Sequence, residues 1–188
     1  MLNLDTYLES TDIINWQHPT IQGLAVQLTS DTTLETAKRC YEWVRDEIYH
    51  SADYHKNPVT CRASDVALER TGFCYAKSHL LAALLRAAGI PAGLCYQRFR
   101  QEDGSYCLHG LNAVYLPDIG WYRIDARGNK PSVNAQFTPP IEQLAFTLDA
   151  TVGEVDLRGV WADPLPQVIT ALSTYTTYDQ LAAHLPDI

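Results

Sequence analysis

Hydrophobic residues in the first half of the chain recur at helical spacing. Between positions 32 and 49 the apolar residues lie three or four apart on one face, and Thr32 and Glu35 have the spacing of a capping box. A shorter segment, 63–69, is predicted to be a second helix. A third apolar run starts after Gly72 and stops at Gly89-Ile90-Pro91, where a glycine terminator precedes a proline that cannot continue a helix. The pattern therefore predicts a helix that begins at or near Cys74.

After Pro91 the hydrophobic pattern changes to a period of two. It predicts three strands, over residues 94–99, 106–116 and 121–125. The segments between them are short, and the first contains the turn-forming pair Asp103-Gly104. Strands joined by short turns form an antiparallel meander. Because the helices precede the strands, the predicted fold class is α+β, with the Cys74 helix packed on an antiparallel sheet.

The two ends of the chain are less regular. Residues 1–30 carry scattered apolar positions and are expected to form a strand or a packing arm. The last part, 131–188, is interrupted by prolines, and short helices are expected over 141–146, 167–173 and 178–185. We expect residues 1–188 to form a single domain, with its core at about 32–130. The helical C-terminal extension, 131–188, then either covers a cleft or completes the core.

Composition narrows the function classes. The chain has 188 residues, of which 46% are hydrophobic, and a net charge of −8, which argues against nucleic acid or an anionic membrane as the main partner. No apolar run approaches the ~20 residues that span a bilayer, and the first residues do not resemble a secretory signal. Five irregularly spaced cysteines indicate reduced thiols rather than a disulfide framework. We therefore expect a cytoplasmic location.

Cys74 is the strongest candidate for chemistry. The free N–H groups and partial positive charge of a helix N-terminus favour a thiolate, although many cysteines are inert core residues. A thiol nucleophile needs a base and an orienting group. His109 lies in the second predicted strand and Asp125 ends the third. Folding about the turn between these strands offsets the two by about three residues, ~10 Å, which a twist or bulge can reduce.

Four segments carry a family resemblance. They are Gly72-Phe73-Cys74, Leu85-Arg86-Ala87-Ala88-Gly89-Ile90-Pro91-Ala92, His109-Gly110-Leu111-Asn112 and Gly120-Trp121-Tyr122-Arg123-Ile124-Asp125. In this order and spacing they resemble the core of the transglutaminase-like superfamily, which has a papain-like fold. The resemblance covers roughly 60–130. It implies that Cys74 is the nucleophile, His109 the general base and acid, and Asp125 the orienting group. The segment from Asp125 to Lys130 looks like a bacterial branch of that superfamily.

Two departures from the family pattern bear on substrate choice. Many members have His-Ala-Trp on the histidine strand, whereas this chain has His109-Gly110-Leu111. After the cysteine, many members have acidic and aromatic residues, whereas Tyr75-Ala76-Lys77 stands here. Large members carry calcium sites in flanking regions, for which this chain is too short. The resemblance therefore implies no calcium and no other cofactor.

Metal binding is a weak alternative at two places. A zinc site needs four ligands at matching positions, and neither candidate set supplies them. The candidate sets are His50, Asp53 and His55 in one polar segment and Cys95, Cys107 and His109 on the strands.

Several other polar residues are candidates for the surroundings of the cysteine. Lys77 could support a thiolate or an acidic substrate group, but is expected to be solvated. His79 lies five residues after Cys74, faces elsewhere and is expected to be structural or at the rim. Tyr96 and Arg98 are candidates to line the cleft, and Asn112 either hydrogen-bonds near the triad or lies at a strand edge.

The sequence thus favours an enzyme, a transglutaminase-like cysteine protease or amidase. Its expected reaction is acyl transfer on a carboxamide or peptide bond through a thioester, with hydrolysis favoured over transfer to an amine. The expected partner is a peptide, protein or small amide substrate. The alternative is a non-catalytic module that holds a peptide in the same cleft.

Overall fold

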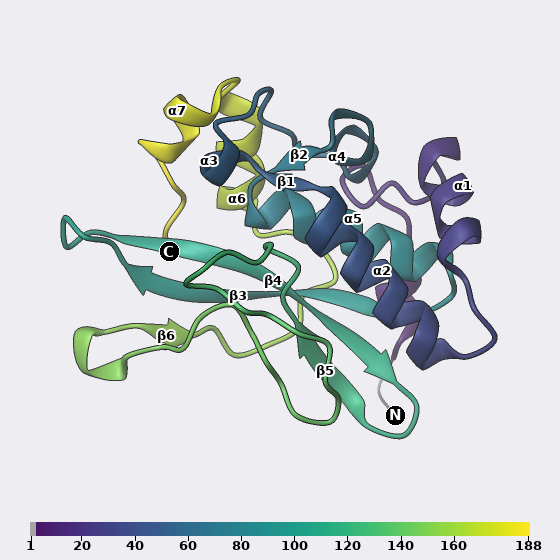
Figure 1. Cartoon of the computed structure of the whole chain (residues 1–188). Helices are drawn as coiled ribbons and strands as arrows, with labels where there is room; N and C mark the ends of the chain where they lie inside the picture. The colour runs from purple at the N-terminus through teal and green to yellow at the C-terminus, as the bar shows by residue number, and fades with distance from the viewer. Residues whose placement is uncertain (1–2) are drawn as a thin grey trace.

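The computed structural model describes residues 3–188 as helices packed on one side of an antiparallel sheet (Figure 1). The sheet has the order β5-β4-β3-β6, and its strands are β3 (Ala92–Arg100), β4 (Tyr106–Leu116), β5 (Gly120–Ile124) and β6 (Val155–Asp156). The first three strands confirm the predicted meander and the α+β class. The fourth was not predicted, because its two residues are exposed and carry no alternating pattern. It pairs with β3 at the edge of the sheet.

The helices precede and follow the sheet along the chain. Those before it are α1 (Pro19–Leu28), α2 (Thr33–Glu47), α3 (Ser51–Tyr54), α4 (Ala63–Glu69) and α5 (Cys74–Ala87). Those after it are α6 (Pro166–Thr174) and α7 (Tyr178–Ala182). Short 3₁₀ turns lie at Asp5–Leu8 and Ala150–Val152, and β1 (Tyr49–His50) pairs in parallel with β2 (Thr71–Gly72). No helix within residues 3–188 is both long and apolar enough to cross a bilayer.

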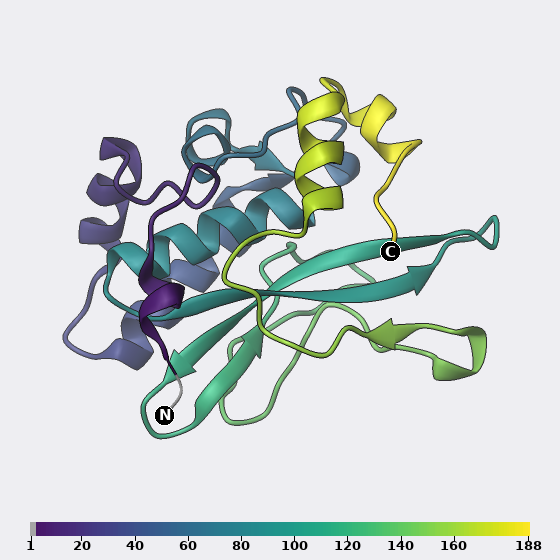
Figure 2. The same ribbon diagram turned by 180° about the vertical axis from the view of Figure 1, so that it is seen from behind.

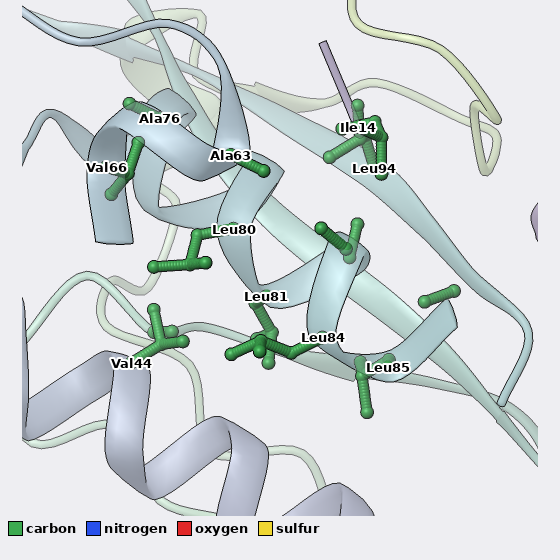
Figure 3. Packing of buried hydrophobic residues seen from close by; sticks show 14 of the residues in the cluster. Ile14, Val44, Ala63, Val66, Ala76, Leu80, Leu81, Leu84, Leu85 and Leu94 are labelled. Carbon is green, nitrogen blue, oxygen red and sulfur yellow. The ribbon is translucent and has the colours of Figure 1, made fainter. Parts of the chain in front are cut away.

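Helix α5 is the centre of the core. It is buried from Cys74 to Arg86, although Lys77, His79 and Arg86 are polar. Figure 3 shows its leucines packed against residues of the neighbouring elements, among them Val44 of α2, Val66 of α4 and Leu94 of β3. The helix that the apolar run predicted is therefore confirmed, with Phe73 as its N-cap residue.

Helix α1 corrects the expectation for residues 1–30. Pro19 occupies the first helical turn, where its missing N–H costs nothing, and the His18 ring accepts a hydrogen bond from the Thr20 N–H (3.3 Å). Ile21 and Ala25, one turn apart, are the buried residues of this helix. A short apolar face and an exposed Gly23 gave the sequence only a weak helical signal.

Helix α2 forms as predicted. The Thr32 hydroxyl accepts a hydrogen bond from the Glu35 N–H (3.2 Å), and Ala37, Tyr41 and Val44 are buried on one face. The first turn of the helix is not covered, so that Leu34 is 48% exposed. The apolar face of α2 therefore packs on α5 only from its second turn onward.

The C-terminal extension packs against the core. Residues of α6 and α7, including Val168, Leu172 and Leu181, are buried in the same cluster as α5. Figure 2 shows both helices beside the end of α5 at which Cys74 lies. Helices α6 and α7 confirm two of the three short helices predicted. The third was wrong, because the backbone of 141–146 makes contacts outside itself: Gln143 forms a bridge with Gln136, and the Ala145 N–H donates to Asp125.

Candidate active site

Cys74 is the first residue of α5, and it lies against strand β4. Phe73 is extended (φ −67°, ψ 167°), so the helix begins sharply at the cysteine. The Gly110 N–H on β4 donates to Cys74 Sγ at 3.5 Å. The sulfur is largely buried and lies on the wall of a cavity.

His109 and Asp125 meet through the register of β4 and β5. Asn112 pairs with Ile124, so His109 lies opposite position 127, and its offset from Asp125 is two residues rather than the expected three. His109 Nε2 and Asp125 Oδ2 are 2.8 Å apart. Cys74 lies beside His109: its sulfur accepts from the N–H of the neighbouring Gly110, and both side chains line one cavity. The structure therefore brings Cys74, His109 and Asp125 together.

Buried charges favour the ionised forms of the histidine and the aspartate. Burial alone lowers the pKa of His109, but the Asp125 carboxylate and Cys74 outweigh it and raise that pKa to about 10. Burial likewise opposes ionisation of Asp125, while His109 and the N–H groups of Ala145 and Arg127 lower its pKa overall. Those two N–H groups donate to the carboxylate, each at 3.1 Å. At neutral pH the pair is therefore an imidazolium and a carboxylate.

Gly110 permits the close approach of β4 to the start of α5. A Cβ at this position would lie 3.0 Å from the Cα and from a ring carbon of Tyr75. The Tyr75 hydroxyl donates to the Leu108 carbonyl and so fastens the two elements together. An alanine in place of Gly110 cannot be accommodated without moving Tyr75.

A partly buried ion pair holds the loop that follows Asp125, and sequence reasoning missed it. Arg127 binds both carboxylate oxygens of Asp53 on α3 (2.6 and 2.9 Å), and Lys130 adds a third contact at 2.9 Å. Burial raises the pKa of Asp53, but the hydrogen bonds from Arg127 and Lys130 outweigh it and lower that pKa below its usual range. Because the Arg127 N–H donates to Asp125, this pair helps to place the aspartate. The partners are 74 residues apart, and no local signal connects them.

Lys77 corrects the expectation of a solvated side chain. It is 1% exposed, and its ammonium donates to the carbonyls of Arg45 and Ile48 at the end of α2. Burial, followed by the charge of Arg127, lowers its pKa to about 7. Lys77 therefore joins the Cys74 helix to α2 and does not face substrate.

His79 and Asn112 are structural. His79 is fully buried, and its Nδ1 lies 2.8 Å from the Cys61 carbonyl, as expected for a structural residue. Asn112 donates from its side chain to the carbonyls of Ser78 and Gly93, so it ties α5 to β3 rather than serving the triad.

A cavity of about 440 Å³ opens beside Cys74 and His109. Tyr96 and Arg98, expected at the cleft, are engaged elsewhere: the Tyr96 hydroxyl accepts from the Leu165 N–H, and Arg98 pairs with Asp187. The extension supplies part of the wall, which agrees with the expectation that it covers a cleft. The remaining lining residues are His50, Ala52, Phe73, Tyr75, Phe99, Arg100, Gln101, Cys107, Leu108, Arg127, Phe146, Ala182 and Leu185.

The weak metal candidates are dispersed or otherwise engaged. Asp53 binds Arg127, and the His55 ring stacks on Tyr178. Cys95 packs in a separate apolar cluster, whereas Cys107 and His109 line the cavity. Across residues 3–188 no three His, Cys, Asp or Glu side chains gather around one point.

A cysteine at a helix start, beside a histidine on β4 and an aspartate that directly follows the adjacent antiparallel strand β5, defines a papain-like α+β class. The model of the transglutaminase-like superfamily matches residues 22–126, and the chain belongs to this superfamily. No curated protein sequence matches the chain.

Two solved structures resemble the fold. One is a protein from Cytophaga hutchinsonii described as a "putative cysteine protease" (20% identity, TM-score 0.53, 66% of this chain and 42% of that chain). The other is the periplasmic domain of TgpA from Pseudomonas aeruginosa (24% identity, TM-score 0.50, 66% and 48%). The chain spans less than half the length of either structure, and at these identities the likeness shows the fold alone.

Proposed function

We propose that this protein is a cysteine-dependent acyl-transfer enzyme in which Cys74, His109 and Asp125 form the catalytic triad. The observation that carries the proposal is that His109, held by Asp125 at 2.8 Å, lines the same cavity as Cys74, whose sulfur accepts from the N–H of the next residue, Gly110. An imidazolium held beside the sulfur favours the thiolate, which is the nucleophilic form of cysteine.

The first half of the reaction forms a thioester. The Cys74 sulfur attacks the carbonyl carbon of a peptide or carboxamide, and the C=O electron pair moves onto oxygen. The N–H groups at the start of α5 have no acceptor within the helix and can stabilise this oxyanion. The C–N bond then breaks, and the His109 imidazolium gives its proton to the leaving amine. Asp125 keeps the ring oriented throughout.

The second half of the reaction releases the acyl group. His109, now neutral, takes a proton from water, which attacks the thioester carbonyl and frees the acid and Cys74. An amine in place of water would give transamidation. We favour hydrolysis by analogy with the Cytophaga hutchinsonii protein, which is described as a "putative cysteine protease".

The boundaries and location of this enzyme are part of the same proposal. We propose that 1–188 forms one domain, since α6 and α7 are buried in the same core cluster as α5. We also propose a cytoplasmic location, on the basis of the five free cysteines.

Differential alkylation tests the triad. Each thiol is labelled with iodoacetamide at neutral pH, and its rate is measured by peptide mapping. Cys74 should react fastest, because burial raises the pKa of both Cys40 and Cys95 to about 12. His109→Asn should slow Cys74 at least about tenfold and leave the other four thiols unchanged. Equal rates at Cys74 in both proteins would favour the non-catalytic peptide-binding alternative.

A further inference from the structure

The cavity beside Cys74 has an aromatic wall next to the proposed catalytic histidine. The rings of Phe99 and Phe146 meet edge to face with centroids 5.0 Å apart, and Phe146 lies equally close to the His109 ring. These contacts fix the positions of both phenylalanines. A group bound here would therefore meet a preformed apolar surface close to the reacting sulfur.

A second part of the wall comes from Ala182 and Leu185 near the C-terminus, in a segment that is held against the sheet. The Leu108 N–H on β4 donates to the Pro186 carbonyl at 2.8 Å. Arg98 binds both carboxylate oxygens of Asp187, at 2.7 and 2.6 Å. These contacts hold Leu185 at the cavity, where it is only partly buried. The extension thus completes the cavity as well as the core.

The charges around the cavity have one sign. Arg100 and Arg127 line it, and Arg127 is already paired with Asp53. Among the described residues of the lining, none is an Asp or Glu. A lysine or arginine side chain would meet cations there and find no carboxylate, whereas an uncharged apolar side chain would exchange water for aromatic and aliphatic contacts.

We propose that this cavity is a specificity subsite that takes a large, uncharged apolar side chain, of leucine or phenylalanine size, on the acyl side of the scissile amide. The inference rests on the proposed function, because it assigns the cavity to the substrate of Cys74. A volume of about 440 Å³ is ample for such a side chain. The substrate class is then a peptide cleaved after an apolar residue.

Peptidyl chloromethyl ketones test the subsite. The Cys74 thiolate would attack the methylene carbon, so that a C–S bond forms, the C–Cl bond breaks and chloride leaves. The probes are acetyl-Phe, acetyl-Leu, acetyl-Ala and acetyl-Lys chloromethyl ketones. Each inactivation rate is divided by the rate of the same ketone with N-acetylcysteine, and the labelled cysteine is identified by mapping, since Cys107 also lines the cavity. The Phe and Leu probes should label Cys74 at least about tenfold faster than the Ala probe, and the Lys probe should be the slowest.

A charge placed in the wall gives a second readout. Leu185→Glu should reduce the preference for the Phe over the Lys probe by about tenfold, since a carboxylate would then face the cation. The matched control is Leu68→Glu, which changes an exposed leucine on α4 outside the cavity and should keep the original preference.

Iodoacetamide, which needs no side-chain subsite, separates the possible failures. If Cys74 reacts rapidly with iodoacetamide but at equal rates with all four ketones, the proposed subsite is wrong and the proposed triad is unaffected. An unchanged preference in Leu185→Glu, with iodoacetamide labelling intact, would lead to the same conclusion. A Cys74 that reacts with none of the reagents would overturn the proposed function, and the subsite with it.

Discussion

Replacement of Lys77 by methionine should change how stability depends on pH. In the folded protein the pKa of Lys77 is lowered, mainly by burial, to about 7, whereas an unfolded lysine has a pKa near 10.5. Below pH 7 both states hold the proton, and the full cost of burying the ammonium is present. Between pH 7 and 10.5 the unfolded state binds more protons, so this group makes stability rise with pH.

The size of the effect follows from the shift. One pKa unit corresponds to about 1.4 kcal/mol, and at pH 7 the folded group is half protonated, so that Lys77 contributes a rise of about 3 kcal/mol between pH 6 and pH 9, most of it above pH 7. A methionine side chain has no proton to release and cannot contribute this rise. The charged neighbours Arg127, Asp125, Asp46 and Asp53 remain in both proteins, and their contributions largely cancel in the comparison. The methionine variant should therefore lose about 3 kcal/mol relative to the natural chain as the pH rises from 6 to 9.

The variant should still fold. The carbonyls of Arg45 and Ile48 lose their donor, but a cavity of about 150 Å³ lined by both residues and by Lys77 gives water room to replace it. Methionine keeps the length and the apolar stem of the side chain.

Urea unfolding followed by tryptophan fluorescence measures this difference at pH 6, 7, 8 and 9. Lys56→Met is the matched control, since the Lys56 ammonium is exposed over the Tyr49 ring, and its removal should leave the pH dependence unchanged. Parallel stability curves for the natural chain and Lys77→Met would show that the buried ammonium does not set this pH dependence.

Three further predictions concern the proposed triad and its supports. Asp53→Asn should weaken the ion pair with Arg127 and displace the loop that holds Asp125. It should therefore lower kcat roughly 10- to 100-fold with little change in KM. An unchanged kcat would show that the loop keeps its position without the ion pair. Gly110→Ala should cost about 1–3 kcal/mol of unfolding free energy in a urea titration, because its Cβ would lie 3.0 Å from Tyr75, and a cost near zero would contradict the close approach. His109→Asn should lose most stability below pH 6.5, where the stabilising contribution of the raised pKa is fully present, and this loss should fade as the pH approaches 10. A difference that is constant over that pH range would contradict it.

The sequence predicted the elements whose signal is local. The run from Cys74 to the glycine and proline that end it marked α5, and alternation with short turns marked β3, β4 and β5. The register was within one residue of the expected value, because the turn between β4 and β5 is short. These elements contain Cys74 and His109, and Asp125 directly follows β5.

What the sequence did not predict depends on contacts between distant residues. From its own segment, Lys77 resembles a surface residue. The carbonyls that accept hydrogen bonds from its buried ammonium belong to the end of α2, a separate segment. Segment 141–146 looks helical, but Asp125 takes one of its N–H groups. The cavity wall at Phe146 and the Asp53–Arg127 pair also join segments that are far apart in the chain. Local pattern carries no signal for such contacts.

Whether Cys74 carries the acyl group is decided most directly by a pre-steady-state burst with acetyl-Leu p-nitrophenyl ester. The natural chain should give a p-nitrophenol burst equal to the enzyme concentration and an acyl adduct that maps to Cys74 by mass spectrometry. Both should be lost in Cys74→Ala. A burst that persists in Cys74→Ala, or an adduct that maps to another cysteine, would contradict the assignment of Cys74 as the nucleophile.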